Sequence, residues 1–419
     1  MIRMPRKRKQ AKYRQAKVVS LVVLLVIVAG CGGSHPAGIN NDTEAVQPIV
    51  SNKVKVLDKY DVQIVEKREN RLILDGDLPS LERDDVLVSG QGEGLLRKVV
   101  SIQRGRATTI VVETAPATLE DVFEQADIYI SKIVTPDDII LPQGLPDGVT
   151  IITPSHSGRG EVVALEFKTQ ESIIFGSGKS SISASMSMKF GLKYDLIIKI
   201  RQRRLVYFLF ALSPTLKGDM KLRSAVSFLN KKVEKTIFLI IFKPFVIWVS
   251  GVPIVVVPEL KIYLGLDGTA VAGLEMAMVD EATLRIGLEF SNGFWHPIAD
   301  KTFEAHLLPD LMIKPFGELS AKAYMRLELA FKLYGATGPF SKIEEYIEGK
   351  WTHQSSPTPT HTIDFALGLA SGVGVKVDIP VIGNNLIRFE KENLVDIKKR
   401  PPFFPIILSG SAEVPVIIQ

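Results

Sequence analysis

The sequence predicts a mainly β protein, with a small N-terminal β-domain that carries one short helix and a large antiparallel β-sandwich-like domain. Apolar and polar residues alternate with a period of two over long segments such as "SISASMSMKFGLKYDLIIKI", residues 181–200. Dipeptides typical of tight turns, such as Asn292-Gly293, separate such segments. With 419 residues, of which 46% are hydrophobic, the chain is long enough to bury more than one core.

The first thirty residues are typical of an export signal. Residues 1–17 carry eight basic side chains and no acidic one, and residues 18–30 are almost entirely apolar. About a dozen apolar residues are too few to cross a hydrocarbon core of ~30 Å comfortably as a helix. We therefore expect a cleaved signal peptide, with an uncleaved anchor or a signal without lipidation as the alternative.

Cys31 is the only cysteine of the chain, and it directly follows Val28, Ala29 and Gly30. This stretch resembles the lipobox of bacterial lipoproteins, which implies cleavage before Cys31 and acyl chains on Cys31. Two or more acyl chains hold a protein stably on a membrane, whereas one chain holds it only marginally. The resemblance implies a lipid-anchored envelope protein. In such lipoproteins an aspartate directly after the cysteine resembles an inner-membrane retention signal. This chain has Gly32 at that position, so the outer membrane or cell surface is the expected location.

The net charge of +5 comes from the signal segment. Without the eight basic residues of the signal, acidic side chains slightly outnumber basic ones, so a nucleic-acid partner is not expected. With Cys31 lipidated no disulfide can form, and a folded core has to stabilise the mature chain.

Composition divides the remaining chain into four parts. Residues 31–48 lack apolar periodicity and predict a flexible tether. Residues 49–134 contain short alternating segments and predict the small β-rich domain. Residues 135–160 hold four prolines and several glycines, which discourages regular elements and predicts a linker, and residues 161–419 form the large antiparallel β domain.

One helix is expected within the small domain. Thr118 and Asp121 have the spacing of a capping box, and Glu120 and Asp121 complement the dipole of the first turn. We expect a short helix here, followed by a strand over Ile128–Val134.

The clearest part of the large domain predicts a meander of three strands. Alternation covers 260–266, 270–278 and 284–290. The predicted turns are Asp267-Gly268, Asp280-Glu281 and Asn292-Gly293. The apolar stretch 236–257 is interrupted by Lys243, Pro244, Gly251 and Pro253, so it favours two buried strands over a transmembrane helix.

A further resemblance rests on two groups of passages. The first is "DDVLVSGQGEGLLRKVVSIQ" with "ETAPATLEDVFEQADI", and the second is "GVPIVVVPELKIYLGLDGTAVAGLEM" with "FSNGFWHPIADKTFEAHL". They are similar to a group of large, β-rich, functionally uncharacterised bacterial secreted or surface proteins. The similarity covers most of residues 70–350. It implies compartment and architecture, and it supplies no active-site pattern.

Two glycine-rich stretches could suggest nucleotide binding. "SGQGEGLL", residues 89–96, has Leu95 where a dinucleotide fingerprint needs its third glycine, and a strand pattern follows, so a hairpin loop is favoured. "FGSGKSS", residues 175–181, has Ile173 where a phosphate-binding loop needs its first glycine, and again a strand pattern follows.

No catalytic, cofactor-binding or metal-binding residues are predicted. The histidines show no four-residue helical spacing, no G-x-S-x-G motif occurs, and Cys31 is committed to lipidation. The carboxylate pairs Asp84-Asp85, Asp137-Asp138 and Glu344-Glu345 are interpreted as surface groups.

The preferred function is therefore a non-enzymatic binding or structural module on the envelope, with a protein, glycan or lipid ligand left open. One alternative is a carrier that encloses lipid or another apolar ligand in a curved sheet, because "LVYFLFAL", residues 205–212, is hydrophobic on both faces. A second alternative is an envelope hydrolase whose site assembles only in the fold.

Overall fold

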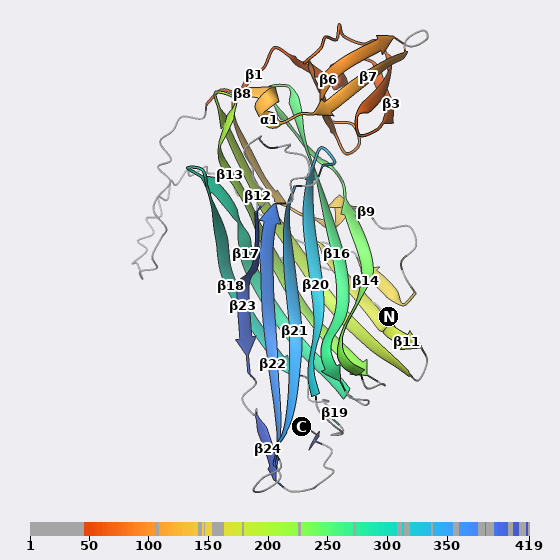
Figure 1. Ribbon diagram of the computed structural model, residues 1–419, viewed down its shortest axis with the longest axis vertical. Coiled ribbons are helices and arrows are strands. Elements are labelled where there is room, and N and C mark those ends of the chain that lie inside the picture. The colour runs from red at the N-terminus through yellow and green to blue at the C-terminus, as the bar shows by residue number, and fades with distance from the viewer. Residues whose placement is uncertain are drawn as a thin grey trace, which may run out of the picture. The chain divides into compact units, whose positions relative to one another are not determined.

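The computed structural model describes residues 46–104, 109–140, 145, 147–152, 163–177, 180–224, 228–270, 274–307, 312–313, 319–336, 338–354, 360–375, 382, 389–400, 405–409 and 416–417 (Figure 1). These residues lie in one compact unit, Ala45–Gln419. Strands dominate the described part, and a single short α-helix occurs in it, which confirms the predicted mainly β fold.

The small sheet has six strands in the order β2-β5-β6-β7-β4-β3. The strands are β2 (Val54–Val56), β3 (Val62–Lys67), β4 (Arg71–Gly76), β5 (Val86–Ser89), β6 (Leu95–Arg104) and β7 (Thr109–Pro116). A 3-10 turn, η1 (Leu57–Lys59), separates β2 from β3. Fully buried leucines, among them Leu72, Leu74 and Leu87, form its core.

The predicted helix and hairpin are confirmed in this region. Helix α1 (Leu119–Val122) has the complete capping box, in which the Thr118 side chain accepts from the Asp121 backbone N–H and the Asp121 side chain accepts from the Thr118 backbone. Strands β5 and β6 pair antiparallel on either side of "QGEG", so the glycine-rich stretch is a hairpin loop.

Two long sheets contain most of the remaining described strands (Figure 1). We call them sheet I and sheet II. Sheet I contains β1 (Ile49–Val50), β8 (Phe123–Ile133), β10 (Val149–Ile152), β11 (Leu165–Ser177), β12 (Ser180–Arg201), β13 (Arg204–Ser224), β17 (Leu274–Ser291) and β18 (Phe294–Leu307). Sheet II contains β9 (Ile139–Ile140), β14 (Phe228–Phe242), β15 (Phe245–Val249), β16 (Val252–Ala270), β20 (Leu319–Leu333), β21 (Pro339–Gln354), β22 (Thr360–Val375), β23 (Phe389–Lys399) and β24 (Ile406–Ser409). A separate pair joins β19 (Met312–Ile313) and β25 (Val416–Ile417).

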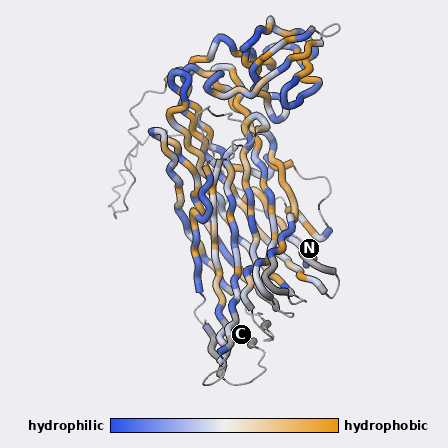
Figure 2. Tube along the Cα trace, in the orientation of Figure 1, coloured by the Kyte–Doolittle hydropathy of each residue, from blue (hydrophilic) through white to orange (hydrophobic). Residues whose placement is uncertain are grey.

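The inner faces of the two sheets pack against each other through aromatic and aliphatic side chains. Phe331 of β20 contacts Tyr194 of β12 and Phe210 of β13, with ring centroids 4.9 Å apart in both pairs. Phe167 of β11 meets Phe238 of β14 at 5.1 Å. Figure 2 shows hydrophobic and hydrophilic residues alternating along these strands. This is the sandwich-like packing that period-two alternation predicts, because alternate side chains of one strand point to opposite faces.

Several sequence-predicted turns of the long sheets need correction. The predicted turn at Asp267-Gly268 is wrong, because β16 runs through it to Ala270 while pairing with β20. Gly268 has a φ of +116°, and a Cβ there would lie 2.0 Å from the Ser320 carbonyl oxygen, so the glycine serves a close strand approach within the ladder. The turn at Asn292-Gly293 is confirmed between β17 and β18.

The predicted turn at Asp280-Glu281 is also wrong. Strand β17 is continuous from Leu274 to Ser291, with Asp280 facing the interior and Glu281 facing out. Strands β16 and β17 are consecutive in the chain, yet they lie in opposite sheets, so the predicted meander is not formed. The reason is that a dipeptide of two acids resembles a turn in the sequence even when one of the acids points into a core.

The assignment of carboxylate pairs to the surface is wrong for two members. Asp85 is 2% exposed and accepts a hydrogen bond from the Glu82 backbone N–H at 2.8 Å, with Lys53 and Lys55 nearby. Glu345 is 1% exposed in the interior between the sheets. Its neighbour Glu344 points to the other face and pairs with Lys322.

The predicted linker contains regular structure within its described residues. The 3-10 turn η2 (Pro136–Asp138) and β9 follow β8, and β9 pairs with β14. Strand β10 pairs with β11. In addition β8, which the sequence assigned to the small domain, pairs with β12 of sheet I. Whether 49–134 and 161–419 fold as separate units stays a prediction.

The apolar stretch 236–257 lies in the strands β14, β15 and β16 rather than in a helix. Within the described ranges the chain has no helix of the length and apolarity needed to cross a membrane.

Candidate functional site

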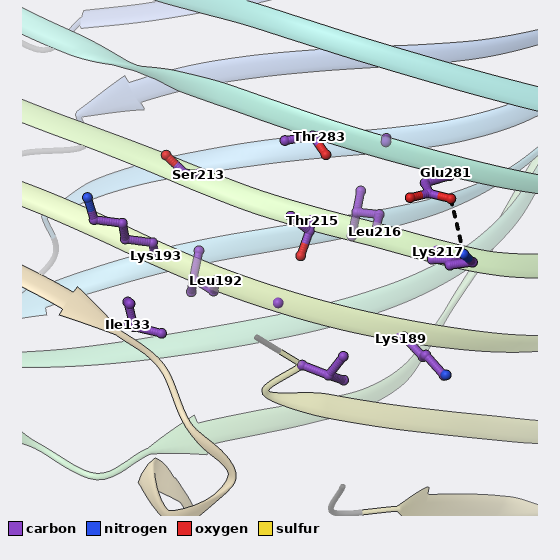
Figure 3. Close-up of a pocket in the computed structure, with 13 residues that line it drawn as sticks. Ile133, Lys189, Leu192, Lys193, Ser213, Thr215, Leu216, Lys217, Glu281 and Thr283 are labelled. Carbon is purple, nitrogen blue, oxygen red and sulfur yellow. Dashed lines mark ion pairs between the residues drawn. The ribbon is translucent and has the colours of Figure 1, made fainter. Parts of the chain in front are cut away.

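A hollow of about 320 Å³ lies on the outer face of sheet I, over β12, β13 and β17 (Figure 3). We call it the lysine hollow. Its polar lining consists of Lys189 and Lys193 from β12, Ser213, Thr215 and Lys217 from β13, and Glu281 and Thr283 from β17. Ile133 and Val163 supply apolar parts of its wall, and Gly191 lies in its lining as well. Leu192, Leu216 and Ala282 also belong to the lining, but they are buried in the core on the other side of the sheet.

The local fold explains why the surface is hollow at this point. On one side of β12 two partner strands meet end to end, because β8 ends at Ile133 opposite Lys193 and β11 begins at Leu165 opposite Phe190. Gly191, which lies between these two positions, has no side chain to fill the space. On the other side of β12 the floor is made by the short side chains of Ser213, Thr215 and Thr283, with longer lysines around them.

The two lysines of β12 lie at opposite ends of the hollow. Lys189 and Lys193 are four residues apart on one face of a strand, which places their Cα atoms ~13 Å apart. Figure 3 shows their side chains on either side of the hydroxyl-bearing residues. A ligand of this length with hydroxyl and anionic groups could therefore contact both lysines and the hydroxyl floor.

Charges in the lysine hollow are only partly paired. Lys217 forms an ion pair with Glu281 at 3.2 Å, and Lys193 approaches Asp195 at 3.4 Å. Among the described residues, Lys189 has no ion-pair partner within 4.0 Å. The hollow thus carries a net positive charge, which attracts anions and keeps one ammonium group available for a ligand.

A second hollow, of about 310 Å³, lies on the outer face of sheet II. Three of the four cations in its lining pair with protein carboxylates, Lys322 with Glu344 at 2.5 Å, Arg326 with Glu234 at 2.6 Å and Lys342 with Glu390 at 3.2 Å. The fourth, Lys232, has its ammonium 5.9 Å from the Tyr324 ring centroid. These ion pairs would have to be broken or shared before an anionic ligand could bind there. The lysine hollow is therefore the better candidate.

The third candidate is a pair of acids between the sheets, Asp280 of β17 and Glu345 of β21. Desolvation raises the pKa of Asp280 to about 7, helped by repulsion from Asp219 and opposed by a hydrogen bond with Glu345. Burial, together with repulsion from and hydrogen bonding to Asp280, raises the pKa of Glu345 well above its usual value. Both Glu345 carboxyl oxygens and Oδ2 of Asp280 lack a separate donor among the described residues. Two acids in this position share a proton, and among the described residues no third histidine, cysteine, aspartate or glutamate lies close enough to complete a metal site.

The residues predicted for lipidation and signal cleavage, Val28, Ala29, Gly30 and Cys31, lie outside the described residues. Of the histidines, His296 and His306 are exposed on β18, while His353 and His361 pair through their backbones across β21 and β22. In the part of the chain that the structure describes, no three histidine, cysteine, aspartate or glutamate side chains lie close enough to hold a metal ion.

Sequence reasoning missed the lysine hollow. The stretch "KFGLK", residues 189–193, places two lysines and a glycine on one face of a predicted strand, and this was the available signal. Ser213, Thr215 and Lys217 come from the next strand, β13, but Thr283 and Glu281, the partner of Lys217, come from β17, which follows much later in the chain. The sequence alone therefore does not assemble the site.

Comparison with known proteins adds no further assignment: no family model matches the chain, and no curated protein or solved structure matches it.

Proposed function

We propose that this chain is a lipid-anchored cell-envelope protein that acts as a non-enzymatic binding module and uses the lysine hollow to bind an anionic, hydroxyl-bearing ligand. Acidic carbohydrate is the class of ligand that suits the hollow best. A uronate or phosphorylated sugar offers both an anionic group for a lysine and hydroxyls for the serine and threonine side chains. The anchor itself is proposed from the resemblance around Cys31.

The observation that carries this proposal is Lys189 at one end of a hydroxyl-lined hollow, with no ion-pair partner within the described part of the chain. A charge-assisted hydrogen bond contributes about 1.5–3 kcal/mol, which corresponds to roughly a tenfold to hundredfold difference in affinity. Neutral sugars would lack this contribution. The ligand is expected to bind more weakly as salt increases, because the site is open to solvent.

Titration calorimetry with oligogalacturonate and with neutral malto-oligosaccharide of equal length tests the proposal. We expect measurable binding of the acidic oligomer alone, and a loss of at least about tenfold in affinity on Lys189→Gln. Lys398→Gln, which changes an exposed lysine of β23 that pairs with Glu348 in sheet II, is the matched control and should bind as the wild type does. Equal affinity for both oligomers, or an unchanged affinity in Lys189→Gln, would contradict the assignment.

The carrier and the hydrolase remain the alternatives. Mass spectrometry of small molecules extracted from the purified mature protein would favour the carrier if it released a stoichiometric lipid. Shortening of the oligosaccharide during the calorimetric experiment, seen by chromatography, would favour the hydrolase.

A further inference from the structure

The outer face of sheet I carries aromatic and apolar side chains at the end where the β12–β13 and β17–β18 turns lie. We define the end patch as Tyr129 of β8, Ile197 and Lys199 of β12, Tyr207 of β13 and Phe294 of β18. Strand register places these residues on neighbouring positions, because Tyr129 pairs with Ile197, Lys199 with Tyr207, and both Tyr207 and Phe294 with Ser291. The Lys199 ammonium lies 5.9 Å from the Tyr129 ring centroid and 5.4 Å from that of Tyr207.

The aromatic rings at the edges of the end patch are unusually open to solvent. Phe294 is 70% exposed and Tyr129 is 55% exposed. Val206, in the ladder irregularity next to Tyr207, and Ile49 of β1 add exposed aliphatic surface. Clustered exposed apolar groups of this kind are typical of a surface that contacts a partner or a membrane.

Charged side chains of both signs surround the end patch, and Glu289 forms a hydrogen bond with Tyr207. Arg201 pairs with Asp127 at 2.7 Å, and Arg203 pairs with Glu124 at 2.5 Å. Arg204 is exposed in the same turn, and no ion pair to it occurs among the described residues. Lys199 and Arg204 are therefore the cations of the patch that can meet anionic headgroups.

The chain that leads toward Cys31 enters the fold at this same corner. Ile49 of β1 pairs with Gln125 of β8, four residues from Tyr129, and Ser51 accepts a hydrogen bond from Arg203. Ile49 lies only 18 positions after Cys31 in the sequence. Such a length spans at most ~65 Å when extended, and ~23 Å on average as the flexible coil that the sequence predicts. Acyl chains on Cys31 would thus keep the corner close to the bilayer.

We infer that the end patch rests on the bilayer surface to which Cys31 is anchored, with Phe294, Tyr129 and Tyr207 at the headgroup level and Lys199 and Arg204 against anionic lipid. This inference rests on the lipid anchor of the proposed function. Aromatic side chains favour the interface between hydrocarbon and water, and basic side chains near the surface gain from anionic headgroups. The docking orients the protein, so that the anchor does not leave it free to turn in every direction.

A fluorescent label on a single introduced cysteine tests the docking in the full-length protein. His296→Cys places the label on β18, two residues from Phe294 and on the same face, while Val279→Cys places a control label on the outer face of β17, about 40 Å along the strand from Ser291. In vesicles of phosphatidylethanolamine and phosphatidylglycerol, headgroup nitroxide lipid should quench the label at 296 at least threefold more than the label at 279.

The double substitution Phe294→Ser and Tyr129→Ser should reduce quenching at 296 to the level at 279, with an unchanged melting temperature. Replacing phosphatidylglycerol by phosphatidylcholine should weaken the quenching as well. Equal quenching at both positions in the otherwise unchanged protein, or quenching at 296 that survives the double substitution, would overturn the inference. A dimer that the double substitution dissociates would also overturn the inference, because the end patch would then be the contact with a second copy of the chain.

Failure of the anchor can be told apart from failure of the docking. If the mass of the mature protein shows no acyl chain, the same labels in the Cys31→Ala background, mixed with preformed vesicles, still report on the end patch. Docking then predicts selective quenching at 296 that rises with lipid concentration, and quenching at neither position would overturn the inference.

Discussion

At the scale of single residues, two carboxyl groups between the sheets dominate the chemistry of the interior. Asp280 and Glu345 face each other from β17 and β21 in a mainly apolar core that also buries the hydroxyl residues Ser341 and Ser371. Among the residues described, Asp219 of β13 is the further charged group that acts on Asp280, with Lys168 of β11 next to Asp219. A buried charge without a cation partner is costly, so the pair is stable only while it keeps a proton.

The pair therefore predicts that stability falls with rising pH. The folded-state pKa of Asp280, about 7, lies above that of an unfolded aspartate, so unfolding releases a proton in the range between about 4 and 7. The free energy of unfolding decreases through this range, and it decreases further at higher pH because the pKa of Glu345 is also raised. Urea unfolding at pH 5 and pH 8 measures the difference.

Replacing Glu345 by Gln should raise the free energy of unfolding at pH 8 by on the order of 1–3 kcal/mol and change it little at pH 5. Glu344→Gln is the matched control, since it removes only an ion pair with Lys322 on the outer face. A wild-type protein of equal stability at both pH values would show that the two carboxyls do not retain a proton in the fold.

A second prediction concerns the stability of the fold when a side chain is added at Gly94. Its φ is +85°, and a Cβ there would lie 2.8 Å from Val255 and 2.9 Å from Tyr334, whose hydroxyl donates to the Pro253 carbonyl oxygen. Gly94→Ala should lower the free energy of unfolding by about 1–3 kcal/mol, because it adds both overlap and backbone strain. Gly92, at φ +59° with nothing near a Cβ, is the control, and Gly92→Ala should cost less in the same urea titration.

In the long strands, the alternation of the sequence decides which face of the sheet a polar residue lies on. The order of the strands in the sheet decides which residues of other strands lie next to it. On β12, Met186, Met188 and Phe190 are buried, while Lys189 and Lys193 face out. This much follows from the period of two. The neighbours of these lysines depend on strand pairing. Lys189 lies opposite Lys217 because β12 pairs with β13, and Lys217 lies opposite Glu281 because β13 pairs with β17.

The segment between β8 and β11 predicts where a protease cuts first. Arg159 is the only trypsin site in residues 135–160, whereas Lys261 is paired on both sides, with β14 and β20. Limited trypsin digestion should cut after Arg159 before any site in 260–290, because the sequence around Arg159 predicts a linker rich in proline and glycine, and such linkers are cut before sheet strands. Mass spectrometry of the fragments checks this, and Arg159→Gln should abolish the first cut. Early cleavage at Lys261 in the wild type would contradict the division of the chain into domains.

At the scale of the whole molecule, the proposed anchor makes the prediction that separates a lipoprotein from an ordinary secreted protein. Cys31→Ala removes the thiol that would carry lipid, and because lipoprotein cleavage follows acylation, the variant should keep residues 1–30. The mass and the N-terminal sequence of the purified protein measure both effects. The wild type should begin at Cys31, carry acyl chains and resist extraction by salt while yielding to detergent. Unmodified Cys31 in the mature wild type would remove the anchor from the proposed function.

Local sequence signals determined the mainly β class, the capped helix at Thr118, the hairpin loop in "QGEG" and the turn at Asn292-Gly293. They suffice for these features because alternation, capping and tight turns depend on residues only a few positions apart. The same signals failed at Asp280-Glu281 and Glu344-Glu345, where one acid of each pair points into a core that the local sequence does not reveal.

The tertiary structure alone decided which sheet each strand joins, and with it the lysine hollow, the acid pair and the end patch. The lysine hollow takes its charged residues from widely separated parts of the sequence, Lys189, Lys217 and Glu281. The end patch draws on an even longer stretch, from Tyr129 through Tyr207 to Phe294. Strand pairing between distant segments brings each set together. The sequence of one strand does not specify which other strand it will pair with.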